Sequence, residues 1–202
     1  MTTISHIVFD IGKVLIHYDP ELPFLHLIPD EDRRAWFLGE VCTGAWNIEQ
    51  DRGREWHVAE AELIERHPEE ADLIRAFRRH WHEMVPHALD GSVAMMERLI
   101  DDGHDVTMLT NFAADTFVEA RRRYTFLNRP RGVTVSGEVG LIKPDAAIYD
   151  LHARTFGLSP AETLFIDDSA RNVEAAKSAG WNAVLFVDAD GLRADLARHG
   201  FA

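Results

Sequence analysis

Six polar residues that could do chemistry together stand at the ends of short apolar segments or in a nearby loop. They are Asp10, Thr110, Asn111, Lys143, Asp167 and Asp168. Their side chains would supply three carboxylates, a hydroxyl, an amide and an ammonium. Three carboxylates brought together repel one another and raise one another's pKa unless a cation lies among them. Oxygen ligands of this kind suit Mg²⁺, and the ammonium of Lys143 could neutralise remaining charge and hold the oxygens of a phosphoryl group.

These side chains can meet only if the segments that carry them are neighbouring strands of one sheet. Four apolar runs are too short for helices and predict buried strands. The runs are 4–9, 105–109, 163–166 and 183–187. A predicted helix precedes each of the last three runs. These helices end at Gly103, Gly157 and Gly180, in that order. Alternating strands and helices predict an α/β fold, with a Rossmann-like parallel sheet as the core and helices on both of its faces.

In an open parallel sheet, ligands bind beyond the carboxyl ends of the strands. The first predicted strand leads into Asp10, the second into Thr110 and Asn111, and the third into Asp167 and Asp168. Lys143 belongs to a loop, Gly-Leu-Ile-Lys-Pro, that lies just before a predicted helix. We therefore expect all six residues to border one crevice.

The segment from 17 to 86 interrupts the alternation of strands and helices. It contains no convincing strand, and helices are predicted over 30–38, 55–66 and 69–84. We expect an all-helical cap at residues 17–86, inserted into a Rossmann-like catalytic core made of residues 1–16 and 87–202.

The composition limits the classes of partner. Of 202 residues, 46% are hydrophobic and 27% are charged, as in ordinary globular proteins. A formal net charge of -13 disfavours binding to nucleic acid, and no apolar run approaches the length of a membrane span. The single cysteine, Cys42, cannot form an intramolecular disulfide, so a cytoplasmic location is the simplest expectation. The sequence does not predict an oligomeric state.

Four segments, IVFDIGKVL, TMLTN, GLIKP and LFIDDSARN, resemble in their order the motifs of the haloacid dehalogenase superfamily. The resemblance implies that Asp10 attacks phosphorus and forms an aspartyl-phosphate. It implies that Mg²⁺ is held by Asp10, the backbone carbonyl of Gly12, Asp167 and, directly or through water, Asp168.

The resemblance also assigns roles to the remaining motif residues. Thr110 and Lys143 would hold the transferring oxygens. Asn111 would donate to the phosphoryl group or position the Asp10 loop, and Gly12 would also border the substrate. Asn172 would orient the last motif.

One position departs from the usual pattern of these phosphatases. Most of them carry a second aspartate two residues after the nucleophile, where it serves as general acid and base, and this chain has Gly12 there. The D-x-G-x-V pattern resembles a branch that includes sugar-phosphate phosphatases, such as those acting on glucose 1-phosphate. Either the substrate's leaving group needs little protonation, or Lys13, His17 or a cap residue supplies the proton.

The sequence therefore predicts a Mg²⁺-dependent phosphatase that acts on a small phosphorylated metabolite, such as a sugar phosphate. A metal-independent 2-haloacid dehalogenase is an alternative, but the enzymes of that family place serine and asparagine where this chain has Asp167 and Asp168. A second alternative, suggested by Gly12, is a catalytically weak family member that binds a metabolite or a protein.

Overall fold

A five-stranded parallel sheet forms the centre of the protein, in a computed structural model that describes residues 3–201. Its strand order is β3-β2-β1-β4-β5. The strands are β1 (His6–Phe9), β2 (Asp105–Thr110), β3 (Val133–Val135), β4 (Thr163–Asp167) and β5 (Asn182–Leu185). His6 pairs with Asp105 of β2 on one side and with Thr163 of β4 on the other, so β1 is the central strand. The predicted α/β class and parallel sheet are confirmed.

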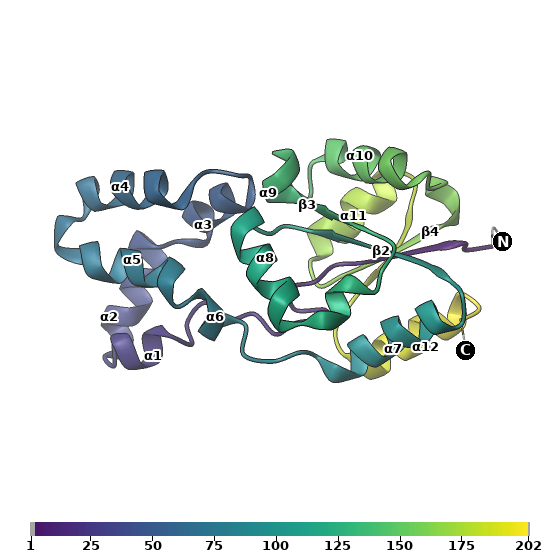
Figure 1. The fold of residues 1–202 in the computed structure, drawn as a ribbon, viewed down its shortest axis with the longest axis horizontal. Helices are drawn as coiled ribbons and strands as arrows, with labels where there is room; N and C mark the ends of the chain where they lie inside the picture. Colours follow the sequence, from purple (N-terminus) through teal and green to yellow (C-terminus); the bar gives the residue numbers. More distant parts are fainter. Residues whose placement is uncertain (1–2, 202) are drawn as a thin grey trace.

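Helices cover both faces of the sheet (Figure 1). They are α7 (Asp90–Asp101), α8 (Ala114–Arg123), α9 (Ser136–Val139), α10 (Ala146–Phe156), α11 (Ala170–Ser178) and α12 (Ala189–Arg198). Val8 of β1 packs with α10 and α11 residues, whereas its neighbours Ile7 and Phe9 pack with α7, α8 and α12. This alternation follows from the two-residue period of a strand, and it explains why both faces of the central strand are apolar.

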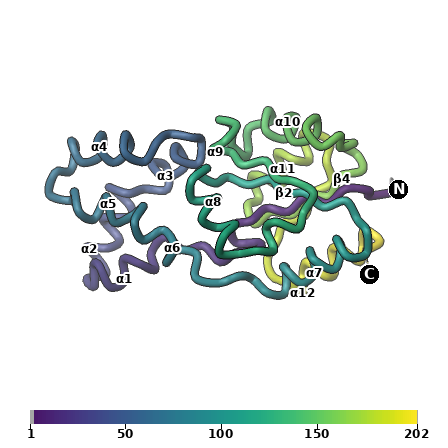
Figure 2. The backbone as a smooth tube through the Cα atoms, viewed as in Figure 1, coloured from purple at the N-terminus to yellow at the C-terminus, as the bar shows by residue number. Residues whose placement is uncertain are grey.

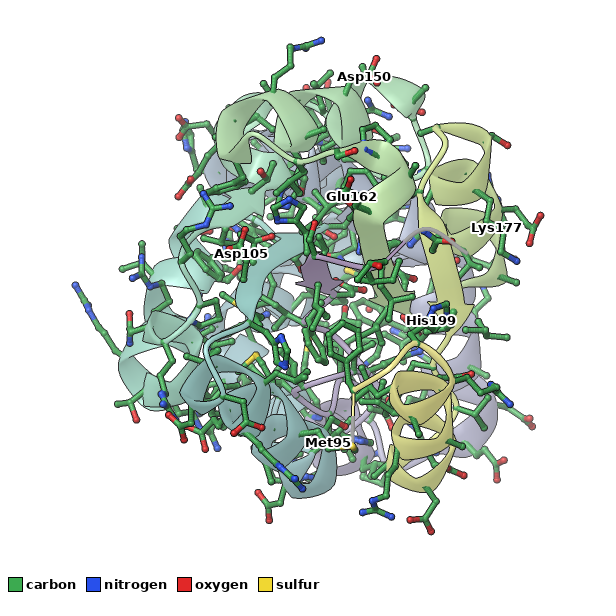
Figure 3. The ribbon with its side chains drawn as sticks, turned by 90° about the vertical axis from the view of Figure 1, so that its right-hand side faces the viewer. Met95, Asp105, Asp150, Glu162, Lys177 and His199 are labelled. Carbon is green, nitrogen blue, oxygen red and sulfur yellow. The ribbon has the colours of Figure 1, made fainter. Side chains whose placement is uncertain are left out.

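Figure 3 looks onto the amino ends of the strands, the edge opposite to the predicted crevice. Asp105, the first residue of β2, and Glu162, the residue before β4, lie near the middle of this view. Asp150 of α10 and Met95 of α7 mark the helices on the two faces of the sheet.

Between β1 and α7 the chain forms six α-helices, which lie beyond the carboxyl end of β1 (Figures 1 and 2). They are α1 (Phe24–Leu27), α2 (Glu31–Trp36), α3 (Gly44–Asp51), α4 (Trp56–Arg66), α5 (Ala71–Arg79) and α6 (Trp81–Met84). A π-helical turn, Phe37–Val41, extends α2. We refer to residues 17–86 as the helical insertion. None of the described helices is both long enough and apolar enough to cross a membrane.

Two chain segments join the helical insertion to the sheet, and they run side by side. The amide of His17 donates to the carbonyl of His87 at 3.0 Å, and the amide of Asp19 donates to the carbonyl of Met84 at 2.9 Å. The rings of His17 and His87 stack with 4.9 Å between their centroids. On the sheet side, the hydroxyl of Tyr124 donates to the carbonyl of Val85. These contacts fix the point from which the helical insertion extends over the strand ends.

Candidate active site

A buried lysine lies between two carboxylates at the carboxyl ends of β1 and β4. Lys143 Nζ is 2.8 Å from Asp10 Oδ1 and 2.7 Å from Asp167 Oδ2. All three side chains are buried, with at most 9% of any one exposed. Because β1 and β4 are hydrogen-bonded neighbours, Asp10 and Asp167 reach the same point in space although 157 positions separate them in the sequence.

The electrostatics of this cluster follow from burial and from its three charges. Burial raises the pKa of Asp10 to about 7, a shift that the Lys143 ammonium opposes and the Asp167 carboxylate reinforces. Burial disfavours the ammonium of Lys143, but the attraction of Asp10 and Asp167 outweighs it and holds the pKa of Lys143 above its ordinary value. Lys143 therefore stays charged where it can neutralise an anion.

Asp167 is held in place by the first turn of α11. Its Oδ1 accepts hydrogen bonds from the Ser169 amide at 2.8 Å and from Asn172 Nδ2 at 3.0 Å, and Asn172 also reaches Oδ2 at 3.1 Å. Asn172 thus contacts the last motif, in keeping with the orienting role that the resemblance implies. Asp168 is half-buried; burial and the neighbouring Asp167 raise its pKa, against the lowering effect of Lys13 and Lys143.

The donor set fits a divalent cation. One oxygen from each of Asp10, Asp167 and Asp168 lies within 4.8 Å of the others. When these groups are ionised, the single ammonium of Lys143 leaves negative charge in excess, which a divalent cation would balance. Hard carboxylate oxygens are the ligands that Mg²⁺ prefers.

Thr110 and Asn111, at the end of β2, have different surroundings. The hydroxyl of Thr110 is buried and has no hydrogen-bond partner among residues 3–201, an arrangement that suits a group meant to bind a ligand oxygen. Asn111 instead grips the backbone of the lysine loop. Its Nδ2 donates to the Lys143 carbonyl at 3.0 Å and its Oδ1 accepts from the Lys143 amide at 2.8 Å. Asn111 therefore fixes the loop that carries the ammonium, a contact that the sequence did not suggest.

Gly12 lies in the loop after Asp10, where the chain turns back on itself. The amide of Ile16 donates to the carbonyl of Ile11 at 3.0 Å, and Lys13 takes a left-handed conformation with a φ of 58°. A Cβ built on Gly12 would meet no atom within 4 Å. The position therefore has room for a side chain, so steric crowding does not explain the glycine.

A pocket of about 520 Å³, partly open to solvent, lies between the helical insertion and the loops that follow β1 and β2. Gly12 and Asn111 border it on the side of the sheet. Most of its wall is apolar, and four aromatic residues contribute to it. These are Tyr18, Trp56, Trp81 and Phe112. Trp46 is a core residue that packs against Trp56 and Phe77. Trp56 is only partly buried, and Trp81, although buried in the same core cluster, also borders the pocket.

Polar contacts close the helical insertion onto the sheet around this pocket. Ser136 Oγ donates to the carbonyl of Asp51 at 2.5 Å, and Arg52 pairs with Asp145 at 3.3 Å.

A second group of contacts joins α4 and α5 to α8. Trp56 Nε1 donates to Asp115 at 3.1 Å. Arg78 reaches the same carboxylate at 2.9 Å and Glu119 at 2.6 Å. None of these contacts could be read from the sequence, because their partners are far apart along the chain and belong to no motif.

The backbone of the loop after β2 packs so closely on Gly137 that no side chain fits at this position. A Cβ there would lie 2.6 Å from the Ala114 nitrogen and 2.8 Å from the Phe112 oxygen, both backbone atoms. We expect Gly137→Ala to lower the free energy of unfolding by about 1–3 kcal/mol, because the backbone must move to admit the methyl group. Gly39→Ala is the matched control: its Cβ would meet nothing within 4 Å. Urea unfolding of both variants measures the effect, and equal stabilities would contradict the prediction.

Comparison with known proteins agrees with this geometry. A family model described as haloacid dehalogenase-like hydrolase matches residues 4–180. The sesquiterpene phosphatase astK of Aspergillus oryzae is 25% identical over 192 residues, which are 93% of this chain and 92% of that protein.

Solved structures share the fold. One is a HAD family enzyme of Bacteroides thetaiotaomicron in complex with magnesium and inorganic phosphate, with a TM-score of 0.71, 19% identity, and coverage of 92% of this chain and 95% of that one. Another is the L-2-haloacid dehalogenase of Xanthobacter autotrophicus with chloropropionic acid covalently bound, with a TM-score of 0.67, 16% identity, and coverage of 99% and 85%. The match of the family model over most of the chain shows that this protein belongs to the haloacid dehalogenase-like hydrolases.

Proposed function

We propose that this hydrolase is a Mg²⁺-dependent phosphatase that cleaves phosphate monoesters of small metabolites through an aspartyl-phosphate on Asp10. The observation that carries the proposal is the cluster of three neighbouring carboxylates, Asp10, Asp167 and Asp168, two of which contact one buried ammonium. A 2-haloacid carries its own carboxylate, which Asp167 and Asp168 would repel. The dehalogenase alternative is therefore disfavoured, although such an enzyme shares the fold.

The residues divide the work as follows. A carboxylate oxygen of Asp10 attacks phosphorus, and the bond from phosphorus to the ester oxygen breaks. The Lys143 ammonium and the Thr110 hydroxyl bind phosphoryl oxygens and stabilise the charge that develops there. Asp10, the Gly12 carbonyl, Asp167 and Asp168 would hold Mg²⁺, which supplies further charge neutralisation at the transferring group. Water then attacks the aspartyl-phosphate, and Asp10 is released.

Residues 17–86 act as the cap and residues 1–16 and 87–202 as the catalytic core in this proposal. The aromatic wall contributed by Trp56 and Trp81 surrounds the organic part of the ester. Apolar groups gain about 0.8 kcal/mol for each buried CH₂, so the lining favours a hydrocarbon-rich alcohol over a sugar. The name of the Aspergillus relative, a sesquiterpene phosphatase, supports the same substrate class.

Phosphate release from a panel of esters tests the function and the substrate class together. The panel contains a sesquiterpenyl phosphate, 2-phenylethyl phosphate, glucose 1-phosphate and glucose 6-phosphate, each with Mg²⁺ and with EDTA. We expect release with Mg²⁺ only, and a kcat/KM at least about tenfold higher for the apolar esters, which corresponds to burial of roughly two CH₂ groups. A preference for glucose 1-phosphate would support the sugar-phosphate hypothesis instead. Halide release from 2-chloropropionate in EDTA would establish the dehalogenase alternative.

A further inference from the structure

The site described so far has no group that can protonate the leaving alcohol. Cleavage of an alkyl phosphate leaves an alkoxide that needs a proton, and hydrolysis of the aspartyl-phosphate needs a group that takes a proton from water. Asp10, Asp167 and Lys143 are engaged with one another. Gly12, on the side of the site that faces the pocket, has no side chain.

Asp51 is the one carboxylic acid in the lining of this pocket among residues 3–201. It ends α3, and its own carbonyl accepts the hydrogen bond from Ser136, which holds this end of the helix against the sheet domain. The same pocket is bordered by Gly12, two residues after Asp10, and by Asn111, which holds the Lys143 backbone, so the space that Asp51 lines begins beside the phosphoryl site. Asp51 therefore lies on the leaving-group side of the site.

The environment of Asp51 favours proton exchange at neutral pH. Burial raises its pKa to about 7, with a hydrogen bond from the Ala113 backbone acting in the opposite direction, and no cationic side chain contributes. The adjacent Arg52 is paired with Glu49 and Asp145 instead. A carboxyl group whose pKa is close to the working pH can both give and take a proton.

The other groups that could exchange a proton are placed less well. Tyr18 lines the pocket, but burial together with Asp51 and Asp19 raises the pKa of its hydroxyl far above neutrality. Lys13 is exposed, and His17 is stacked on His87 in the link to the helical insertion. Neither Lys13 nor His17 contributes to the pocket lining.

We propose that Asp51 is the general acid and base of the reaction, replacing the acid that Gly12 cannot provide. In the first step Asp10 bonds to phosphorus, the phosphorus–oxygen bond of the ester breaks, and the Asp51 carboxyl gives its proton to the leaving oxygen. In the second step the Asp51 carboxylate takes a proton from water as the water oxygen attacks phosphorus. Asp10 leaves as a carboxylate, Asp51 is protonated again, and phosphate is free. The inference rests on the proposed phosphatase function.

Two esters of similar size separate this role from a structural one. Loss of 2-phenylethanol from its phosphate needs a proton, whereas 4-nitrophenolate leaves without one. We expect Asp51→Asn to lower kcat/KM for 2-phenylethyl phosphate about 10²- to 10⁴-fold. With 4-nitrophenyl phosphate the same variant should release one equivalent of nitrophenolate in a rapid burst and then turn over slowly, because only the second step still needs the base. Asp19 is a carboxylate close to Tyr18 but outside the pocket lining, so Asp19→Asn is the matched control.

A second variant tests the assignment by rescue. Because a Cβ at Gly12 meets nothing within 4 Å, Gly12→Asp can place a carboxyl on the same side of the site. We expect the double variant Gly12→Asp/Asp51→Asn to have a kcat/KM for 2-phenylethyl phosphate at least about tenfold higher than that of Asp51→Asn. A general acid contributes about 10²-fold or more, and an acid that is not ideally placed should still restore part of that effect. Equal losses on the two esters in the first step, with no rescue, would show that Asp51 acts only structurally. Absence of any Asp10-dependent phosphate release from the wild-type protein would instead overturn the phosphatase function itself.

Discussion

Asp10→Asn is expected to abolish phosphate release, with kcat/KM falling by at least about 10⁴-fold on every ester. The amide keeps the shape of the carboxyl but cannot form the bond to phosphorus, so the covalent route is lost. The loss must be independent of the leaving group, which distinguishes it from the effect expected at Asp51. Phosphate release measures the rate, and mass spectrometry after acid quenching tests whether wild-type protein, but not the variant, carries a phosphoryl group.

Folding of the Asp10→Asn variant needs its own control. Asp10 is one of two carboxylates that contact the buried Lys143, and Asp167 remains as a partner in the variant. We therefore expect a folded protein whose far-UV circular dichroism matches that of the wild type. A folded variant that retains more than a few per cent of wild-type turnover would exclude Asp10 as the nucleophile.

Lys143→Met is expected to lower both activity and stability. The Lys143 side chain is 1% exposed and its ammonium lies between two carboxylates, and removal of one partner from a buried ion pair costs about 3–5 kcal/mol. Activity should fall by about 10²- to 10³-fold or more, because a charge that stabilises the transferring phosphoryl group is lost. Urea unfolding in EDTA and phosphate release in Mg²⁺ give the two values separately.

An exposed lysine supplies the comparison. Lys177 is 2.9 Å from Glu174 in α11 and is 47% exposed, so Lys177→Met should change the free energy of unfolding by less than about 0.5 kcal/mol. Added Mg²⁺ should stabilise Lys143→Met more than it stabilises the wild type, because it would offset the repulsion between Asp10 and Asp167. Equal unfolding free energies for the two lysine variants would contradict the buried charge cluster as described.

The sequence could predict the sheet and the acidic cluster because local patterns determine both. Val8 and its neighbours form an apolar run that only a buried central strand accommodates, and Asp10 directly follows that run. β3 was not predicted, because its three residues are too few to show a period. The helix α3 was also missed, since its residues include few apolar positions and its N-cap, Thr43, is its clearest signal.

The pocket could not be predicted, because it depends on contacts between distant parts of the chain. Asp51 resembles any acidic residue at a helix end until the packing of α3 near Gly137 brings it to the same space as Gly12. Trp46 and Trp56 have the same residue type and lie ten positions apart, yet one is core and the other lines the pocket. Residue type and spacing carry no information about which of them faces the ester.

The hydrogen bond from Ser136 to the Asp51 carbonyl joins two halves of the molecule that each hold one part of the proposed reaction. The nucleophile belongs to the sheet, and the proton donor belongs to the helical insertion. An ester too bulky to let α3 dock against α9 could still place its phosphate beside Asp10. Its leaving-group oxygen would then be out of reach of the Asp51 carboxyl and would receive no proton from it. Such a molecule would bind as an inhibitor without being hydrolysed, so discrimination among phosphate esters would depend on turnover more than on affinity.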